Sequence, residues 1–236
     1  MIAVRDLEVS FGDLRVLDGV SLDVAPGEFV SVLGPSGSGK STLFGVLAGL
    51  LVPDAGEVAT GSVAYMPQKD LLFPWRSVLD NTSLGLEVGG MRRREARARA
   101  LELFEPFGLR GFEHARPEEI SGGMRQRAAL LRTVVQDREV LLLDEPFGAL
   151  DSLTRTAMQE WLEEVRARFG WTVLLITHDV REAVFLSDRV VVLSPRPATV
   201  RADLAVDLPR PRSLETITDP GFAAAEAELL AVLRSR

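Results

Sequence analysis

The fold is decided by one stretch of the chain, Phe29-Val30-Ser31-Val32-Leu33-Gly34-Pro35-Ser36-Gly37-Ser38-Gly39-Lys40-Ser41. Its first five residues form a short aliphatic run, which is typical of a strand buried on both faces. The next eight satisfy the pattern G-x-x-x-x-G-K-[ST], and a helical stretch follows directly. Glycines let backbone N–H groups turn toward an anion, and a helix N-terminus adds partial positive charge. The stretch therefore predicts a phosphate-binding loop, with a purely structural glycine-rich turn as the alternative.

Within this phosphate loop, Gly34–Ser41, two side chains have chemistry suited to a nucleotide. The Lys40 ammonium is expected to reach the β and γ phosphates, and the Ser41 hydroxyl to be a ligand of Mg²⁺. The residues expected to surround the nucleotide phosphates are Gly34, Pro35, Ser36, Gly37, Ser38, Gly39, Lys40, Ser41 and Thr42.

A second apolar strand, Val140 to Leu143, ends in two carboxylates, Asp144 and Glu145. Asp144 is placed to hold Mg²⁺, directly or through a water, and Glu145 is placed to polarise an attacking water. Two acids after a strand also suit the start of a turn, but beside a phosphate loop the metal and base roles are favoured.

Polar residues follow four of the predicted strands, namely Gly34, Gln68, Asp144 and His178. Ligand sites in open α/β sheets lie at the carboxyl ends of the strands, so these residues are expected to converge on one edge. For His178 we expect a γ-phosphate contact rather than a hydrogen-bonded histidine of the core. The other histidine, His114, lies in a polar loop and receives no role.

The remaining pattern predicts an α/β fold: a mixed, mainly parallel sheet with helices on both faces. Ala3 to Val24 alternates and carries turn signals at Ser10 to Asp13 and at Asp18-Gly19, which predicts an antiparallel β subdomain. In Ser152 to Phe169, apolar residues that include Leu153, Ala157 and Trp161 recur at helical spacing, as in a helix covering the sheet. The apolar runs expected to be strands are 28–33, 62–66, 140–143, 172–177 and 189–193.

Two segments depart from this rhythm. Residues 81–120 are predicted to be a helical subdomain, with helix formers dense from Arg92 to Phe107. Its cluster of five arginines between 92 and 99 has two interpretations, a solvated helix face or a docking patch. Residues 196–236 are predicted to be an extended, proline-marked tail ending in a short helix near Phe222 to Leu233. Residues 1–80 and 121–195 then form the nucleotide-binding core.

Composition limits the classes of function. The 236 residues carry 27 Lys+Arg against 34 Asp+Glu, and a net charge of -7 disfavours nucleic acid as a partner. The apolar runs are far shorter than the roughly 18 residues that a membrane span needs. The absence of cysteine and of an apolar leader stretch at Met1 suits the cytoplasm.

The segment Ile120-Ser121-Gly122-Gly123-Met124-Arg125-Gln126-Arg127 precedes another helical stretch, which leads into the second strand. With this segment in place, nearly the whole chain resembles the nucleotide-binding subunit of ABC transporters. The matching motifs are the P-loop at 34–42, the Q-loop Gln68, the signature segment at 121–126, the Walker B strand at 140–145, the D-loop Ala149-Leu150-Asp151 and the switch His178.

The resemblance implies an ATPase that works as a head-to-tail dimer, in which each ATP lies between the P-loop of one subunit and the signature segment of the other. It implies Glu145 as general base, His178 and Gln68 as further catalytic residues, and Mg²⁺ held by Ser41, Gln68 and Asp144. Asp151 would couple the two sites, and Phe11 would stack on adenine. The residues implied to contact ATP across the dimer are Ser121, Gly122, Gly123, Met124 and Gln126.

The stretch Pro67 to Trp75 and the tail Asp207 to Arg212 are similar to the importer subclass that serves nitrate, sulfonates, taurine and thiamine-precursor pyrimidines. The short link Gly56 to Met66 favours the pyrimidine-precursor members. The resemblance implies integral-membrane permease subunits and, through them, a solute-binding protein as partners, with this chain on the inner face of the cell membrane.

Two other classes of function remain as alternatives. One is a soluble ABC-type ATPase acting on DNA, ribosomes or metal clusters, which usually carries coiled-coil inserts, a second cassette or a basic face. The other is a P-loop small-molecule kinase, which leaves Ser121 to Gln126 and His178 without a role.

Overall fold

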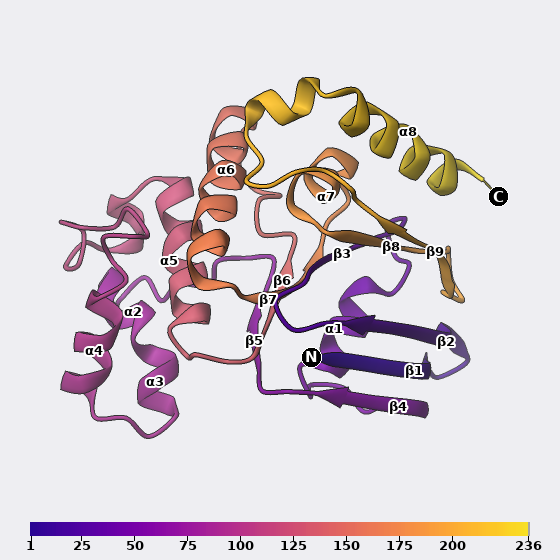
Figure 1. The fold of residues 1–236 in the computed structure, drawn as a ribbon. Helices are drawn as coiled ribbons and strands as arrows, with labels where there is room; N and C mark the ends of the chain where they lie inside the picture. The colour runs from indigo at the N-terminus through magenta and orange to yellow at the C-terminus, as the bar shows by residue number, and fades with distance from the viewer. Residues whose placement is uncertain (236) are drawn as a thin grey trace.

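Two β-sheets form the framework of the computed structural model, which describes residues 1–235 (Figure 1). The larger sheet has six strands in the order β5-β6-β7-β3-β8-β9. Its first five strands are parallel, and β9 joins the edge antiparallel to β8. The strands are β3 (Phe29–Leu33), β5 (Val63–Met66), β6 (Val140–Asp144), β7 (Thr172–Ile176), β8 (Arg189–Leu193) and β9 (Val200–Ala205).

The smaller sheet is antiparallel, in the order β2-β1-β4, and consists of β1 (Ile2–Phe11), β2 (Leu14–Val24) and β4 (Ala55–Thr60). The expected turn at Gly12-Asp13 is present, but the expected turn at Asp18-Gly19 is wrong. Both residues lie inside β2, where the pairing register with β1 shifts and Gly19 has φ of 71°. A glycine with positive φ occurs in β-bulges as well as in turns, so the Asp-Gly pair does not distinguish a bulge from a turn. Strand β4, in the segment interpreted as a link, was not predicted.

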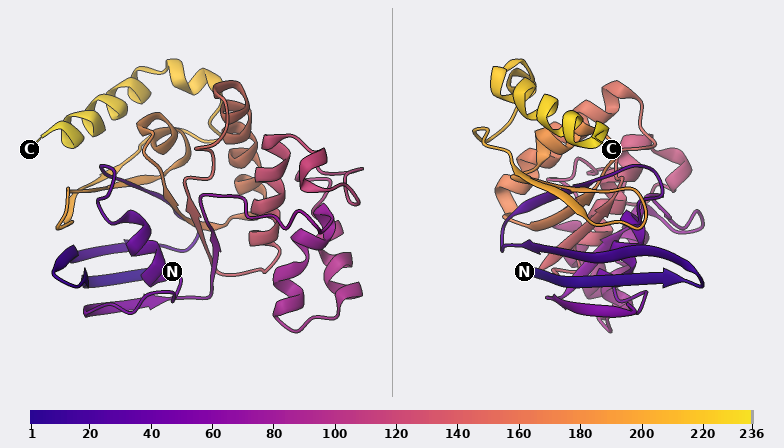
Figure 2. Two further views of the ribbon diagram at one scale, coloured as in Figure 1. Left: turned by 180° about the vertical axis from the view of Figure 1, so that it is seen from behind. Right: turned by 90° about the vertical axis from the view of Figure 1, so that its right-hand side faces the viewer.

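Helices pack on the larger sheet and extend beyond it. Figure 2 shows α8 lying across one side of the molecule and the helices of residues 78–101 forming an arm away from the strands. The α-helices are α1 (Lys40–Leu47), α2 (Val78–Thr82), α3 (Leu84–Val88), α4 (Arg93–Leu101), α5 (Gly122–Val134), α6 (Ser152–Phe169), α7 (Val180–Leu186) and α8 (Pro220–Arg234), with 3₁₀ turns η1 (Pro117–Glu119) and η2 (Leu214–Thr218). Within residues 1–235, no helix has the length and apolar character needed to cross a membrane.

The core divides according to the alternation of side chains along each central strand. Phe29 and Leu33 of β3 pack into the cluster formed with α5, α6, α7 and α8, whereas Val30 and Val32 pack into the cluster formed with α1 and the small sheet. Successive residues of a strand point to opposite faces, so both faces of the larger sheet are covered. This burial explains why its central strands are continuous aliphatic runs, and the predicted fold class is confirmed.

The arm contains less helix than its composition suggests. Helix α4 ends at Leu101, and residues 102–107 form turns, although the sequence from Arg92 to Phe107 favours helix throughout. Three of the five clustered arginines are paired with acids: Arg93 and Arg97 both contact Asp80 at 3.0 Å, and Arg99 contacts Asp137 at 3.0 Å. These arginines therefore tie α4 to its neighbours.

Helix α6 has the predicted bounds but a shorter buried face than expected. Trp161, Leu162 and Val165 are buried, whereas Leu153 is 83% exposed and Ala157 is also exposed. Thr154 and Met158 of the same turns lie against Gly123 of α5, so Leu153 and Ala157, each one position earlier, face away from the core. The expectation that Leu153 and Ala157 cover the sheet is therefore wrong.

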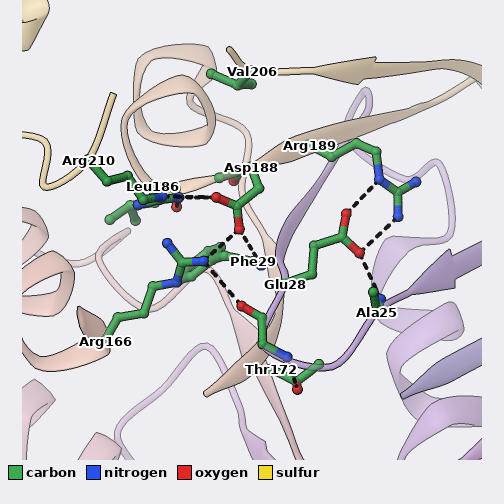
Figure 3. Close-up of polar contacts among 12 residues, drawn as sticks. Ala25, Glu28, Phe29, Arg166, Thr172, Leu186, Asp188, Arg189, Val206 and Arg210 are labelled. Atoms are coloured by element: carbon green, nitrogen blue, oxygen red, sulfur yellow. Dashed lines mark hydrogen bonds and ion pairs between the residues drawn. The ribbon is translucent and has the colours of Figure 1, made fainter. Parts of the chain in front are cut away.

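Two arginines attach the C-terminal tail: half-buried Arg210, labelled in Figure 3, and buried Arg212. Asp188 receives a hydrogen bond from the Phe29 N–H at 2.8 Å and ion pairs from Arg166 at 2.6 Å and Arg210 at 2.8 Å. Burial alone would raise the pKa of Asp188, but these donors outweigh it and hold the pKa below its usual value. Buried Arg212 donates to carbonyls at the end of α7. The segment predicted to be extended also contains β9, whose pairing with β8 was not predicted.

Candidate active site

An open pocket of about 600 Å³ lies at the carboxyl edge of the larger sheet. It is lined by the phosphate loop and by residues that follow β5, β6, β7 and β8, together with side chains from the small sheet. The lining residues are Phe11, Leu14, Val16, Ser36, Gly37, Ser38, Gly39, Lys40, Ser41, Thr42, Gln68, Glu145, His178 and Arg196. Of the four residues expected to converge on this edge, Gln68 and His178 line the pocket, whereas Gly34 and Asp144 do not.

The phosphate loop closes tightly over its own lysine. Lys40 Nζ donates to the carbonyls of Gly34 at 2.8 Å and Pro35 at 3.0 Å, and burial lowers its pKa. Gly39 has φ of 93°, and a Cβ there would lie 2.8 Å from side-chain atoms of Val16 and Leu17. Only glycine suits this position, because both its backbone conformation and the available space exclude a side chain.

Asp144, at the end of β6, is buried beside the phosphate loop. Burial raises its pKa, while bonds from the Tyr65 and Ser41 hydroxyls and the charge of Lys40 act in the opposite direction. The Tyr65 hydroxyl lies 3.2 Å from Asp144 Oδ2, and burial together with Asp144 raises the pKa of Tyr65 to about 12. The tyrosine therefore stays protonated and orients the carboxylate.

Glu145, which follows β6, contacts residues that follow two other strands, β5 and β7. Gln68 Nε2 donates to its Oε2 at 2.9 Å, and His178 Nδ1 lies 3.3 Å from its Oε1. Glu145 has φ of 45°, a conformation that costs a non-glycine residue on the order of 1 kcal/mol or more. Its backbone N–H is held by the carbonyl of Ile176 at 2.8 Å. The strain turns the side chain out of the strand and toward the pocket.

Apolar side chains line the other end of the pocket. Phe11 and Leu14 flank the hairpin turn between β1 and β2 and are half exposed, whereas Val16 is buried beneath them. An exposed aromatic ring facing a pocket offers a stacking surface for a base.

The signature segment does not line this pocket. Ser121 caps α5 by accepting a hydrogen bond from Met124 N at 3.2 Å, and it is exposed. Gly123 and Gln126 are buried, and Gln126 lines a different hollow beside Gln68. Asp151 likewise caps its own helix, α6, by accepting from Thr154 N at 3.1 Å. The structure therefore brings together the P-loop, Gln68, Glu145 and His178, but it leaves Ser121 outside their pocket.

Four residues at or beside the pocket were not predicted: the apolar Leu14 and Val16, and the polar Arg196 and Tyr65. Tyr65 lies within β5 and was treated as part of an apolar run. Arg196 follows β8, so the rule that collects site residues at strand ends could have identified it. It was assigned instead to the proline-marked tail.

Few side chains near the phosphate loop could bind a metal ion, and those that could would bind it through oxygen atoms. Residues 1–235 contain no cluster of three or more His, Asp or Glu side chains suited to chelating a metal alone. The Ser41 hydroxyl lies near enough to the Asp144 carboxylate to lower its pKa, and both groups are beside the phosphate loop. Such a pair fits Mg²⁺, which usually takes one or two protein oxygens together with phosphate oxygens and water.

Comparison with known proteins gives consistent matches. The model of the family described as "ABC transporter" matches residues 17–148. The aliphatic sulfonates import ATP-binding protein SsuB 1 of Rhodococcus jostii is 50% identical over 93% of this chain and 88% of its own length. The formylaminopyrimidine import ATP-binding protein ThiZ of Halalkalibacterium halodurans is 44% identical over 89% of this chain and 86% of its own length.

A solved structure shares the fold. The dimeric structure of MJ0796, a bacterial ABC transporter cassette, superimposes with a TM-score of 0.76 at 30% identity. The match covers 88% of this chain and all of that one.

Proposed function

The chain belongs to the ABC transporter family, and we propose that it is the ATP-hydrolysing subunit of an importer for a small polar solute. One observation carries the proposal: the phosphate loop, Gln68, Glu145 and His178 line a single pocket, with both oxygens of Glu145 engaged. Import ATP-binding proteins match this chain over most of its length, which supports solute transport as the process that consumes the ATP.

The chain's own residues supply the steps of hydrolysis. Lys40 would exchange the loop carbonyls of Gly34 and Pro35 for phosphate oxygens, since all of these groups accept from the same ammonium. Glu145 would take a proton from the attacking water, and His178 would contact the γ-phosphate. Gln68, which bonds Glu145 in this structure, would orient the carboxylate and report on the arrival of a partner.

Magnesium is the metal that suits this site. We propose Ser41 and Asp144 as its protein ligands, joined by Gln68, whose side-chain oxygen is of the same hard type. A bound Mg²⁺ neutralises charge on the β and γ phosphates. Tyr65 would keep Asp144 oriented toward it.

The position of Ser121 supports a head-to-tail dimer. This exposed helix N-terminus lies outside the pocket of its own chain, so it is free to meet the pocket of a second copy. Gly122, Gly123 and Met124 would line the same contact, and Asp151 at the start of α6 would lie between the two sites.

Permease subunits in the membrane are the proposed partners, and a solute-binding protein would deliver the solute to them. This arrangement places the chain at the cytoplasmic face of the membrane. Among the solutes, we favour aliphatic sulfonates over pyrimidine precursors, since the sulfonate relative has the higher identity of the two compared.

The experiment is complementation of a bacterium that lacks its own sulfonate-import ATP-binding subunit. The chain, expressed with its cognate permease and binding protein, should restore growth on an aliphatic sulfonate as sole sulfur source. A Glu145→Gln version should not, and it serves as the matched negative control.

Two results would overturn the proposal or part of it. Growth restored only on a pyrimidine precursor would replace the substrate class. Failure of the tagged chain to co-purify with the permease from detergent-solubilised membranes would overturn the transport role and favour a soluble ATPase.

A further inference from the structure

A free guanidinium faces the phosphate loop from the end of β8. Arg196 lines the nucleotide pocket, and a Cβ placed on Gly37 would lie 3.3 Å from its Nη2 and 3.7 Å from its Cζ. Gly37 lies in the middle of the phosphate loop, three residues before Lys40. The guanidinium therefore lies against the backbone that is expected to hold the phosphates.

Arg196 lacks an internal partner among residues 1–235. It takes part in none of their side-chain hydrogen bonds or ion pairs, although the chain has more acids than bases. By contrast, Arg201, Arg210 and Arg212, three of the arginines that follow β8, donate to backbone or carboxylate oxygens. An arginine beside an anion site with no carboxylate of its own is available to an external anion.

The turn that carries Arg196 is anchored on both sides. Ser194 Oγ accepts from Thr199 N at 3.0 Å and donates to the carbonyl of Pro195 at 2.9 Å. Ala198 is bonded to β2, donating to the Val16 carbonyl and accepting from Asp18 N, both at 2.9 Å. Because Val16 also lines the pocket, these bonds hold Arg196 in place relative to the apolar end of the site.

The charge of the pocket favours the same ligand. Two carboxylates, Asp144 and Glu145, lie at this edge, and Lys40 is the cation that the motif supplies. A nucleotide adds several negative charges, so a second cation on the loop reduces their repulsion. A guanidinium suits the task because its parallel N–H groups match the geometry of phosphate oxygens.

We propose that Arg196 is a nucleotide-binding residue that contacts the phosphate chain of ATP and of ADP from the same subunit. The proposal rests on the ATPase function and adds a contact outside the sequence motifs. Because the contact is made in the bound ground state as well as during reaction, it governs the affinity for nucleotide rather than the chemical step.

The test is titration calorimetry with Mg-ATP and Mg-ADP on the purified chain. The Arg196→Gln variant should bind both nucleotides about tenfold or more weakly, the loss expected for a hydrogen-bonded charge contact. Arg196→Lys should recover part of the affinity. In hydrolysis assays the Arg196→Gln variant should show a raised KM with little change in kcat.

Arg110→Gln is the matched control, because it removes the same charge at an exposed surface pair with Glu105. It should bind both nucleotides as tightly as the unmodified chain does. If Arg110→Gln lost as much affinity as Arg196→Gln, the loss would come from the change in net charge, and the proposed contact would be overturned. A lowered melting temperature of nucleotide-free Arg196→Gln would show a structural role and overturn it as well.

The two proposals fail differently. If the unmodified chain binds no nucleotide, the ATPase function fails. If it binds ATP and ADP, and Arg196→Gln binds them equally well, only the role of Arg196 is overturned.

Discussion

The phosphate loop and the signature segment are both serine- and glycine-rich turns that open a helix, yet they lie in different surroundings. The first opens α1 inside a pocket that also receives Gln68, Glu145 and His178 from the ends of three strands. The second opens α5 on an exposed surface, where Ser121 caps its own helix. A helix N-terminus forms an anion-binding site when neighbouring side chains supply the other contacts. The signature segment lies outside the pocket of its own chain, so it would need a second molecule to form a site.

The largest effect is expected at the phosphate loop, where Lys40→Ala should abolish detectable hydrolysis and weaken ATP binding by about tenfold to a hundredfold. Lys40 is buried, and its ammonium lies against the loop carbonyls of Gly34 and Pro35. Calorimetry and a phosphate-release assay measure the two effects. The only other lysine, exposed Lys69, gives the control Lys69→Ala, which should behave as the unmodified chain. Equal activity of the two variants would refute the site.

Next in size is the loss expected for Glu145→Gln. A general base contributes about 10²- to 10⁴-fold, so hydrolysis should fall by that factor while ATP binding persists. The variant should then accumulate as a dimer in ATP, which light scattering coupled to gel filtration measures. Glu102→Gln, at an exposed position of the arm, is the control. Normal turnover by Glu145→Gln would remove the residue from this role.

The signature segment should respond in a different way. Ser121→Ala is expected to leave ATP binding by the single subunit unchanged and to lower hydrolysis by about tenfold or more, because in the proposed dimer the lost contact is to the ATP of a second copy. Ser77→Ala is the matched control, since Ser77 caps α2 through the same type of bond, to Asp80 N at 3.1 Å. Both variants should lose similar stability, typically about 1 kcal/mol.

Mixing the Lys40→Ala and Ser121→Ala proteins sharpens the comparison further. A mixed dimer contains one site with both halves intact, so hydrolysis should exceed that of either protein alone. If the two halves belonged to one chain, mixing would restore nothing.

The smallest effect is expected for Tyr65→Phe, which removes one hydrogen bond to Asp144. Hydrolysis should fall only a few-fold, in line with about 1 kcal/mol for such a bond. Burial raises the pKa of Asp144 and the Tyr65 bond lowers it, so the variant should raise that pKa further. In the proposed site Asp144 would hold Mg²⁺ only when ionised, so activity should be lost at a higher pH on acidification. A pH profile that does not move would show that Tyr65 does not act through Asp144.

Much of the fold followed from local pattern. Strands such as Val140 to Asp144 are aliphatic because both of their faces are buried, and buried runs are easy to recognise. The wrong predictions concern residues whose local sequence pattern is compatible with two different structures. Gly19 forms a bulge rather than a turn, and Leu153 has helical spacing but no core beneath it.

The candidate site shows the same division. The residues that motifs name, such as Lys40 and Glu145, were found because their roles require particular residue types next to each other in the chain. Tyr65 reaches the site because β5 pairs with β6, and Arg196 reaches it because its turn is hydrogen-bonded to β2. Both contacts join residues that are far apart in the sequence.

The sequence by itself determined the chemistry of each piece: a loop of N–H groups with a lysine, two carboxylates after a strand, a histidine after another strand and a second helix that opens at a Ser-Gly-Gly turn. Only the tertiary structure decided which of these pieces share a pocket. The parallel sheet carries four strand ends to the phosphate loop, whereas α5 starts outside that pocket, because its N-terminus follows the arm rather than the sheet edge. Local chemistry requires only neighbouring residues, but the assembly of a site depends on how strands pair across the whole chain.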